Sequence, residues 1–300
     1  MIIYRHLNLI KMEDSNVIFD SLVIQGGGMY GFYHLGALSY LQENGYLNNI
    51  KNFSGSSIGA IICYLIIIGC SPIEILLTLH TNQITQKLKD SFNLKNILEN
   101  KGIFDFSILR NALNDVTRQK LGKEITMIDI KKMFKKNFSI CTFNYTKKEI
   151  EYITHETNPD MNCIDALQCS ASIPLIFDWY DYDGYIYVDG GFVDNFPIDH
   201  SYIVGNILGL TIMHTCNDNE KSDAINLPDI FTFMYEMFNF PRYQKVKRQI
   251  DKNNLYNIKI ENEKKFTGFS FGLSPNTTLE MFSTGYNCSR NFFKNLKNNI

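Results

Sequence analysis

Short apolar runs alternate with helical stretches along the first seventy residues of the chain. Ser21–Gln25 forms a short apolar run that ends at a cluster of glycines, and leucines spaced three apart then predict a helix over Phe32–Glu43. A second strand is predicted over Ile50–Phe53, and the most apolar run of the chain, Ile58–Gly69, follows it as a buried helix. This alternation of strands and helices is typical of an α/β sheet with parallel pairs of strands.

The rest of the chain continues the alternation. Helices are expected over 72–120, 163–172, 229–252 and 277–296, and strands over 138–145, 149–154, 185–188, 207–213 and 255–260. No repeat or low-complexity linker divides the sequence. We therefore expect one domain over residues 1–300, with a core from about 21 to 293, built as a three-layer α/β/α structure around a mostly parallel sheet.

Composition limits the class of protein. The chain has 300 residues, of which 45% are hydrophobic, and this is enough for one large core. A net charge of -2 gives no support to nucleic-acid binding. None of the seven cysteines forms a C-x-x-C pair, which favours reduced thiols over a zinc site. The first fifteen residues lack the apolar core of a signal peptide, and Ile58–Gly69 is shorter than the roughly 20 residues of a membrane-spanning helix, so we expect a cytoplasmic location.

The turn between the second strand and the buried helix carries a G-x-S-x-G pattern, from Gly55 to Gly59 with Ser57 at its centre. A serine on such a sharp turn projects its hydroxyl at a helix N-terminus, where the helix dipole favours negative charge. Glycines before and after the serine leave room for the crowded turn. The pattern therefore predicts a nucleophile elbow, although a serine that only caps the helix is the alternative.

The glycine cluster after the first strand fits two interpretations. Gly26, Gly28 and Gly31 match G-x-G-x-x-G, the pattern of a dinucleotide-binding loop. That interpretation needs an acidic residue at the end of the second strand, and the sequence there is FSGSSIG. Ends of consecutive parallel strands lie side by side, so the loop is expected beside Ser57. Its backbone N–H groups would then form an oxyanion hole, which binds the negative charge of a tetrahedral intermediate.

A candidate base for the serine lies in the run Asp189-Gly190-Gly191. Asp189 comes at the end of an apolar strand, where active sites of open α/β sheets gather. An ordinary Asp-Gly turn is the alternative.

Three ordered motifs, GGGMYG, GSSIG and DGG, resemble those of the patatin-like phospholipases. Three further segments are similar to that family, which extends the resemblance over roughly 21–293: Ala166–Phe177, Asn195–Pro197 and the EMFSTGYNCSRNFF segment. The resemblance implies hydrolysis of lipid acyl esters, of the phospholipase A or lysophospholipase type. No EF-hand loop or other calcium-ligand pattern appears in the sequence, so we expect no metal, and we expect no cofactor. It implies Ser57 as nucleophile, Asp189 as base and Gly26, Gly27 and Gly28 in the oxyanion loop, with Gly190 and Gly191 completing the dyad motif. Tyr30 departs from the family, which often has Arg or Lys there.

Other interpretations remain open at this point. A Ser–His–Asp triad would use His200 or His214, which both follow Asp189 in the chain. A non-catalytic lipid-binding protein is a second alternative. His34, one turn into the first helix, is expected to make an ordinary packing or surface contact.

The segment Pro228–Gln249 places aromatic residues and methionines before a cluster of basic residues, namely Arg242, Lys245, Lys247 and Arg248. One interpretation is a core helix with a solvated end. The other is an interfacial patch that contacts an anionic membrane surface, where a lipid-cleaving enzyme would find a phospholipid substrate.

Overall fold

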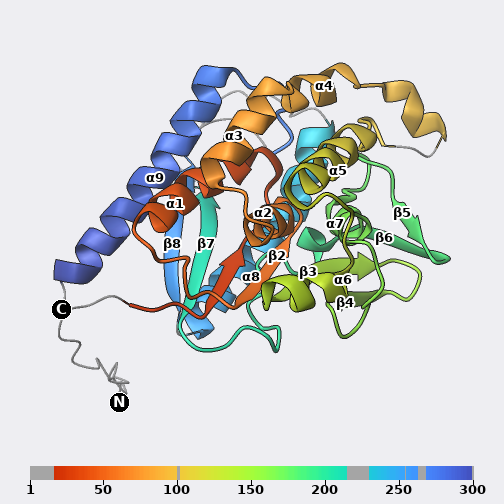
Figure 1. The fold of residues 1–300 in the computed structure, drawn as a ribbon. Coiled ribbons are helices and arrows are strands. Elements are labelled where there is room, and N and C mark those ends of the chain that lie inside the picture. Colours follow the sequence, from red (N-terminus) through yellow and green to blue (C-terminus); the bar gives the residue numbers. More distant parts are fainter. Residues whose placement is uncertain (1–16, 100–101, 215–229, 254, 263–267, 299–300) are drawn as a thin grey trace, which may run out of the picture.

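The computed structural model describes residues 17–99, 102–214, 230–253, 255–262 and 268–298 (Figure 1). Within these ranges the strands form one mixed sheet in the order β5-β6-β3-β2-β1-β7-β8, with β4 also paired to β3. The pairs β3–β2, β2–β1, β1–β7 and β7–β8 are parallel. The pairs β3–β4, β3–β6 and β5–β6 are antiparallel. The strand bounds are β1 Ser21–Ile24, β2 Asn52–Ser56, β3 Asn137–Asn144, β4 Glu149–Ile153, β5 Tyr180–Tyr182, β6 Tyr185–Asp189, β7 Ile207–His214 and β8 Tyr256–Asn262.

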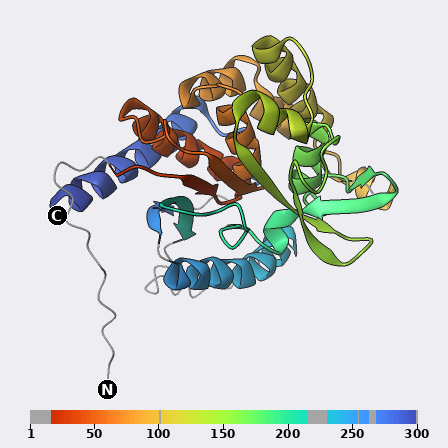
Figure 2. The same cartoon turned by 60° about the horizontal axis from the view of Figure 1, so that its bottom comes forward.

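Helices cover both faces of the sheet (Figure 2). Their bounds are α1 Gly31–Glu43, α2 Ile58–Ile67, α3 Pro72–Thr81, α4 Ile84–Asp90, α5 Ser107–Leu121, α6 Met127–Asp129, α7 Cys163–Ala171, α8 Ile230–Lys252 and α9 Pro275–Asn298. Short irregular helical turns are η1 Gly28–Tyr30, η2 Leu94–Glu99, η3 Ile130–Phe134 and η4 Gly190–Phe192. α1 packs along α9 on one face, and α8 lies on the other (Figures 1 and 2). The expected three-layer architecture is confirmed.

The side chains of β1 show how the sheet separates two cores. Leu22 and Ile24 belong to the large core beneath α1, α2 and α9. Val23 points to the opposite face, where it joins a smaller core with Phe196 and with Val246 of α8. Successive strand residues alternate between the faces, so a central strand covered on both sides is apolar throughout. This explains why β1 reads as a continuous apolar run rather than as an alternating one.

Several boundaries differ from the sequence predictions. β2 begins at Asn52 and continues to Ser56, through the first half of the G-x-S-x-G pattern, whereas the prediction ended it at Phe53. The predicted helical range 72–120 is divided into α3, α4, η2 and α5. Gln83 breaks the first pair of helices because its backbone is left-handed, with φ of 51°. The short elements α6 and β5 had no prediction, since three residues are too few for a periodic pattern.

Among the described residues no single helix is long and apolar enough to cross a membrane. In that part of the chain one pair of helices, α2 and α3 taken together, reaches the required length and hydropathy, and the two are bent by 116° relative to each other.

Candidate active site

Ser57 lies on a tight turn between β2 and α2. Its backbone adopts φ 54° and ψ -129°, a conformation that side-chain-bearing residues rarely occupy. A Cβ atom at Gly55 would lie 2.6 Å from the backbone nitrogen of Ala60, and one at Gly59 would lie 2.3 Å from the carbonyl oxygen of Ile24. Only glycine fits at both positions, which is the steric requirement that the sequence pattern indicated.

Helix α7 holds the backbone of this turn from the side. The Ser57 N–H donates to Oγ of Ser170, 2.9 Å away, and Ser170 Oγ itself donates to the carbonyl oxygen of Cys141 on β3. The amide of Ser57 is therefore fixed before any ligand binds. No motif pointed to Ser170; its only sequence signal is its place in the 166–177 segment.

Asp189 is the last residue of β6 and faces Ser57 although the two are far apart in the sequence. Its side chain is 2% exposed, and its Oδ1 accepts a hydrogen bond of 2.6 Å from the Gly191 N–H. Its Oδ2 has no partner within normal hydrogen-bond geometry among the described residues. Burial raises the pKa of the Asp189 carboxyl to about 6, against the lowering influence of Arg242, the Ser57 hydroxyl and the Gly191 N–H.

The glycine loop lies beside this pair, but its three glycines are not equivalent. The Gly26 N–H donates to the carbonyl oxygen of Asn195 at 3.0 Å, and Asn195 Nδ2 donates back to the Gly26 carbonyl at 3.2 Å. Gly26 therefore cannot serve as an oxyanion donor as the sequence suggested, because its N–H is already used. The N–H groups of Gly27 and Gly28 have no hydrogen-bond partner among the described residues.

Gly28 is the loop residue with the strictest geometry. Its φ is +56°, and a Cβ atom there would lie 2.2 Å from the carbonyl oxygen of Gly268. Tyr30, the departure from the family pattern, is 3% exposed and packs against Gly27. Its ring supports the loop from inside the core and brings no charge to the site.

A cavity of about 520 Å³ extends from Ser57 and Gly28 into the helical layer above the sheet. It is mostly lined by aliphatic and aromatic side chains of α1 to α5 and of the segment that precedes α9, for example Leu35, Ile61, Ile75, Leu113 and Phe271. Pockets of this size and character are typical of small-molecule sites in which a few polar groups fix the orientation of an apolar ligand.

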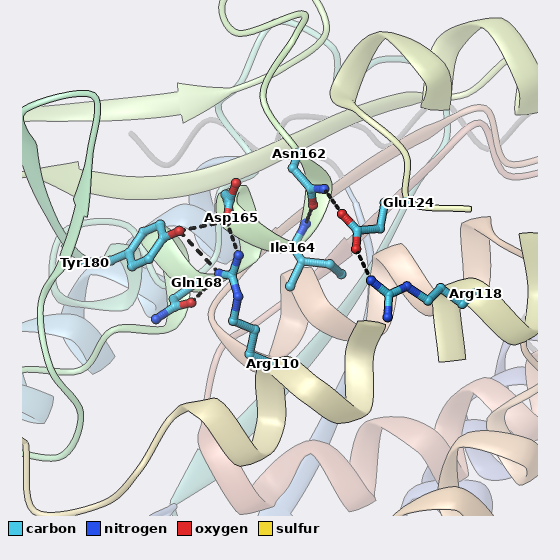
Figure 3. Close-up of polar contacts among 8 residues, drawn as sticks. All are labelled: Arg110, Arg118, Glu124, Asn162, Ile164, Asp165, Gln168 and Tyr180. Atoms are coloured by element: carbon cyan, nitrogen blue, oxygen red, sulfur yellow. Dashed lines mark hydrogen bonds and ion pairs between the residues drawn. The ribbon is translucent and has the colours of Figure 1, made fainter. Parts of the chain in front are cut away.

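Polar contacts join α5, one wall of this cavity, to α7 (Figure 3). Arg110 of α5 donates to Gln168 and pairs with Asp165, both on α7. Tyr180 of β5 donates to the same Asp165 carboxylate at 2.7 Å. Nearby, Arg118 of α5 forms a more exposed ion pair with Glu124. Because α7 also carries Ser170, the cavity wall and the Ser57 turn belong to one connected assembly.

The histidines whose side chains the structure describes do not support a triad. His200 packs against Tyr152 and Tyr202, and no histidine is among the described contacts of Asp189. The side chain of His214 lies outside the described residues. His34 is fully buried, its Nε2 lies 3.0 Å from the Gln25 carbonyl oxygen, and burial lowers its pKa to about 4, so the ring is neutral at physiological pH.

The basic cluster on α8 differs from the predicted interfacial patch. Lys245 donates to the carbonyl oxygen of Val193 at 2.7 Å and pairs with the buried Asp194, and Arg242 donates to Asn195 at 2.8 Å. Two of the four proposed lipid-binding cations therefore point into the protein, because buried polar groups of the 189–199 segment need them.

The remainder of that patch is only partly described. Lys247 and Arg248 are exposed, as are Met237 and Phe240. Residues 228 and 229, and the side chains of 230–236, 238 and 239, lie outside the described residues.

Within the described part of the chain no group of three or more His, Cys, Asp or Glu side chains could hold a metal ion.

The sequence did not predict the hydrogen bond between Arg242 and Asn195. Its only signal was the resemblance of the Asn-x-Pro run, which contains Asn195.

Comparison with known proteins supports the resemblance. "Probable lipid hydrolase 463L" of Invertebrate iridescent virus 6 is 36% identical over 191 residues, which cover 60% of this chain and 62% of that protein. An uncharacterized protein of Acanthamoeba polyphaga mimivirus, R571, is 31% identical over 219 residues, 71% of this chain and 70% of its own length. The crystal structure of VipD from Legionella pneumophila covers 92% of this chain and 67% of its own with a TM-score of 0.56 at 16% identity, a likeness of fold. The chain thus spans less than two thirds of the first of these relatives. The sequence model of the patatin-like phospholipase family matches residues 22–202, and the chain belongs to that family.

Proposed function

We propose that this chain is a lipid acyl hydrolase that cleaves carboxylic esters of fatty acids with a Ser57–Asp189 dyad, and that residues 21–293 form its single catalytic domain. The observation that carries the proposal is the placement of Ser57 between a buried carboxylate and an apolar cavity. Family membership supports ester hydrolysis as the reaction, and the name of the iridescent virus relative supports a lipid as the substrate.

Acylation begins with Asp189 as general base. A carboxyl group with a pKa of about 6 is ionised at neutral pH and is a better proton acceptor than an exposed aspartate. Asp189 takes the Ser57 proton as Ser57 Oγ attacks the ester carbonyl carbon. The carbonyl oxygen becomes an oxyanion, which the N–H groups of Gly27 and Gly28 stabilise. The C–O bond to the alcohol then breaks, and protonated Asp189 returns its proton to the leaving oxygen.

Deacylation repeats these steps with water. Asp189 removes a proton from water, the hydroxide attacks the acyl-serine carbonyl, and the same N–H groups stabilise the second oxyanion. Collapse releases the fatty acid, and Ser57 recovers its proton from Asp189. The left-handed backbone of Ser57 serves this cycle because it keeps the hydroxyl projecting from the turn.

The cavity supports an acyl chain as the part of the substrate that the protein recognises. It starts at Ser57 and Gly28, so a chain whose carbonyl lies in the oxyanion site would continue directly into it. Burial of apolar surface contributes about 0.8 kcal/mol for each CH₂ group, so a long acyl chain would bind more strongly than a short one.

Labelling with a fluorophosphonate, followed by intact mass measurement, tests the proposal. The wild-type protein should gain one adduct and should hydrolyse a p-nitrophenyl ester of a fatty acid. Ser57→Ala should gain none, and its turnover should fall by roughly a millionfold, as for nucleophiles in comparable enzymes. Near-normal hydrolysis by Ser57→Ala would refute the assignment. His200→Ala serves as the control, and a loss of activity there would point to a triad instead.

A further inference from the structure

Helix α8 presents a polar face to the segment that follows β6. Arg242, Lys245 and Gln249 are spaced three and four residues apart, so they lie on one side of the helix. Lys245 and Gln249 both contact the buried Asp194 carboxylate, at 3.2 and 2.9 Å. Gln249 also reaches Asp199 at 3.3 Å. These contacts fix α8 against the segment that runs from Asp189 to the smaller core.

Arg242 is the member of this face that reaches the candidate active site. Its Nη2 donates to Asn195 Oδ1 at 2.8 Å, and its guanidinium carbon lies 5.7 Å from the centre of the Phe192 ring. A Cβ atom on Gly191 would lie 2.9 Å from the same Nη2, so the second glycine of the dyad motif leaves the space that the guanidinium occupies. The positive charge thus lies close to the Asp189 carboxylate.

Asn195 connects this arginine to the glycine loop. Its side-chain oxygen accepts from Arg242, whereas its side-chain nitrogen and its backbone oxygen both bond to Gly26. The side-chain amide can make its two contacts, to Arg242 and to the Gly26 carbonyl, only in one orientation, and the guanidinium selects it. One side chain of α8 therefore places its charge near Asp189 and bonds to Asn195, which supports the glycine loop.

We propose that Arg242 is a positioning residue for the Ser57–Asp189 reaction: its guanidinium places a positive charge beside the Asp189 carboxylate, and its bond to Asn195 holds the glycine loop in register with Ser57. This role rests on the proposed hydrolase function. It requires a planar guanidinium that lies near the Phe192 ring and donates to Asn195, and it requires a positive charge near Asp189; these two requirements can be separated by substitution.

The surroundings of Asp189 make the charge effect specific. From the turn before α2 the carboxylate faces the Ser57 hydroxyl, and from β3 it faces the Cys141 thiol, whose pKa burial raises well above its ordinary value. Lys245 and Asp194 face that thiol and each other. Arg242 is the cation that lowers the pKa of Asp189, so its removal should raise that pKa above about 6.

The experiment measures the rate of fluorophosphonate labelling of the full chain between pH 4.5 and 9 for wild type, Arg242→Gln, Arg242→Lys and Lys247→Gln. Wild type should lose reactivity below about pH 6, where Asp189 becomes protonated. In Arg242→Gln this acid limb should move up by about one to three pH units. In Arg242→Lys the limb should stay within about half a unit, while the plateau rate falls at least about tenfold because an ammonium lacks the planar group that lies near Phe192 and donates to Asn195. Lys247→Gln removes an equal charge from an exposed site on the same helix and should change neither.

An unmoved acid limb in Arg242→Gln would overturn the charge role, and a normal plateau in Arg242→Lys would overturn the positioning role. Circular dichroism and thermal unfolding show whether Arg242→Gln folds. If it does not, the Arg242→Lys plateau decides alone, and an unchanged plateau rejects the inference. Absence of labelling in the wild-type protein would remove the proposed function as a whole, whereas labelling with an unmoved limb removes only the role of Arg242.

Discussion

Replacing Asp189 by Asn should abolish activity and at the same time stabilise the protein at neutral pH. The carboxyl group is 2% exposed and its pKa is raised from 3.8 to about 6, so the folded state binds a proton there more tightly than the unfolded state. The stabilisation from this protonation is fully present below about pH 3.8. It is lost as the pH rises through about 6, because the folded protein must then hold a buried negative charge.

The size of the effect follows from the two pKa values. The interval between 3.8 and about 6 is about 2.2 pH units, and each unit corresponds to 1.36 kcal/mol, which gives about 3 kcal/mol. Asparagine does not titrate. The free energy of unfolding of Asp189→Asn minus that of wild type should therefore increase by about 3 kcal/mol between pH 3.5 and pH 7. Typical domains have 5–15 kcal/mol in total, so this is a large share.

Urea titrations at several pH values measure the difference directly, provided that both proteins unfold in two states. Subtracting the free energy of unfolding of wild type from that of the variant cancels the contribution of every group that titrates identically in both proteins. Only Asp189 and its neighbours then contribute to the pH dependence of the difference. The matched control is Asp181→Asn, on the exposed edge of β5, where the difference from wild type should stay within about 0.5 kcal/mol across the range. A pH-independent difference for Asp189→Asn would refute a raised pKa and with it the explanation of why this carboxylate is a competent base.

Two further predictions concern the cavity and its wall. Ala112→Phe places a ring in the cavity, so kcat/KM for a palmitoyl ester should fall at least about tenfold while that for a butyryl ester stays within about twofold. The control is Asn111→Phe, on the exposed side of α5. Equal losses of kcat/KM on both esters in Ala112→Phe would exclude the cavity as the acyl site. Arg110→Gln leaves a half-buried carboxylate without its ion pair and should lower the free energy of unfolding by about 2 kcal/mol, whereas Arg118→Gln breaks an exposed pair and should cost less than about 0.5 kcal/mol. Equal costs in urea titrations would contradict the view that Arg110 joins the cavity wall to α7.

The features that the sequence predicted well depend on neighbours close in the chain. The elbow at Ser57 needs glycines two residues away on each side, because the backbone of α2 lies against Gly55 and the backbone at the end of β1 lies against Gly59. The parallel pairing of β1 with β2 follows from a strand–helix–strand order that the hydrophobic periodicity reveals. These are local constraints, so the residues themselves record them.

The features that the sequence did not predict depend on contacts across the whole chain. The glycine loop predicts Gly26 as an oxyanion donor, but its N–H donates to the backbone oxygen of Asn195, 169 residues further along the chain. The sequence predicts Lys245 as a membrane-facing cation because nothing local shows that Asp194 is buried beneath it. In each case a polar group was assigned to a ligand although another part of the protein already satisfied it. Periodicity gives the face of a helix but not the partner of that face.

Under the proposed function, one face of the sheet supplies the apolar cavity and the other supplies the cation near Asp189. The helices that line the cavity bring almost no charge to Ser57, which suits an acyl chain, but an apolar environment alone would keep a carboxylate protonated. The compensating cation, Arg242, comes from α8 on the opposite face and reaches Asp189 past Gly191. In the proposed dyad, Asp189 is thus desolvated enough to be a base and is still ionised near neutral pH. On the proposed function a single helical layer could not supply both conditions, because a cation placed in the cavity would have to be desolvated together with the acyl chain.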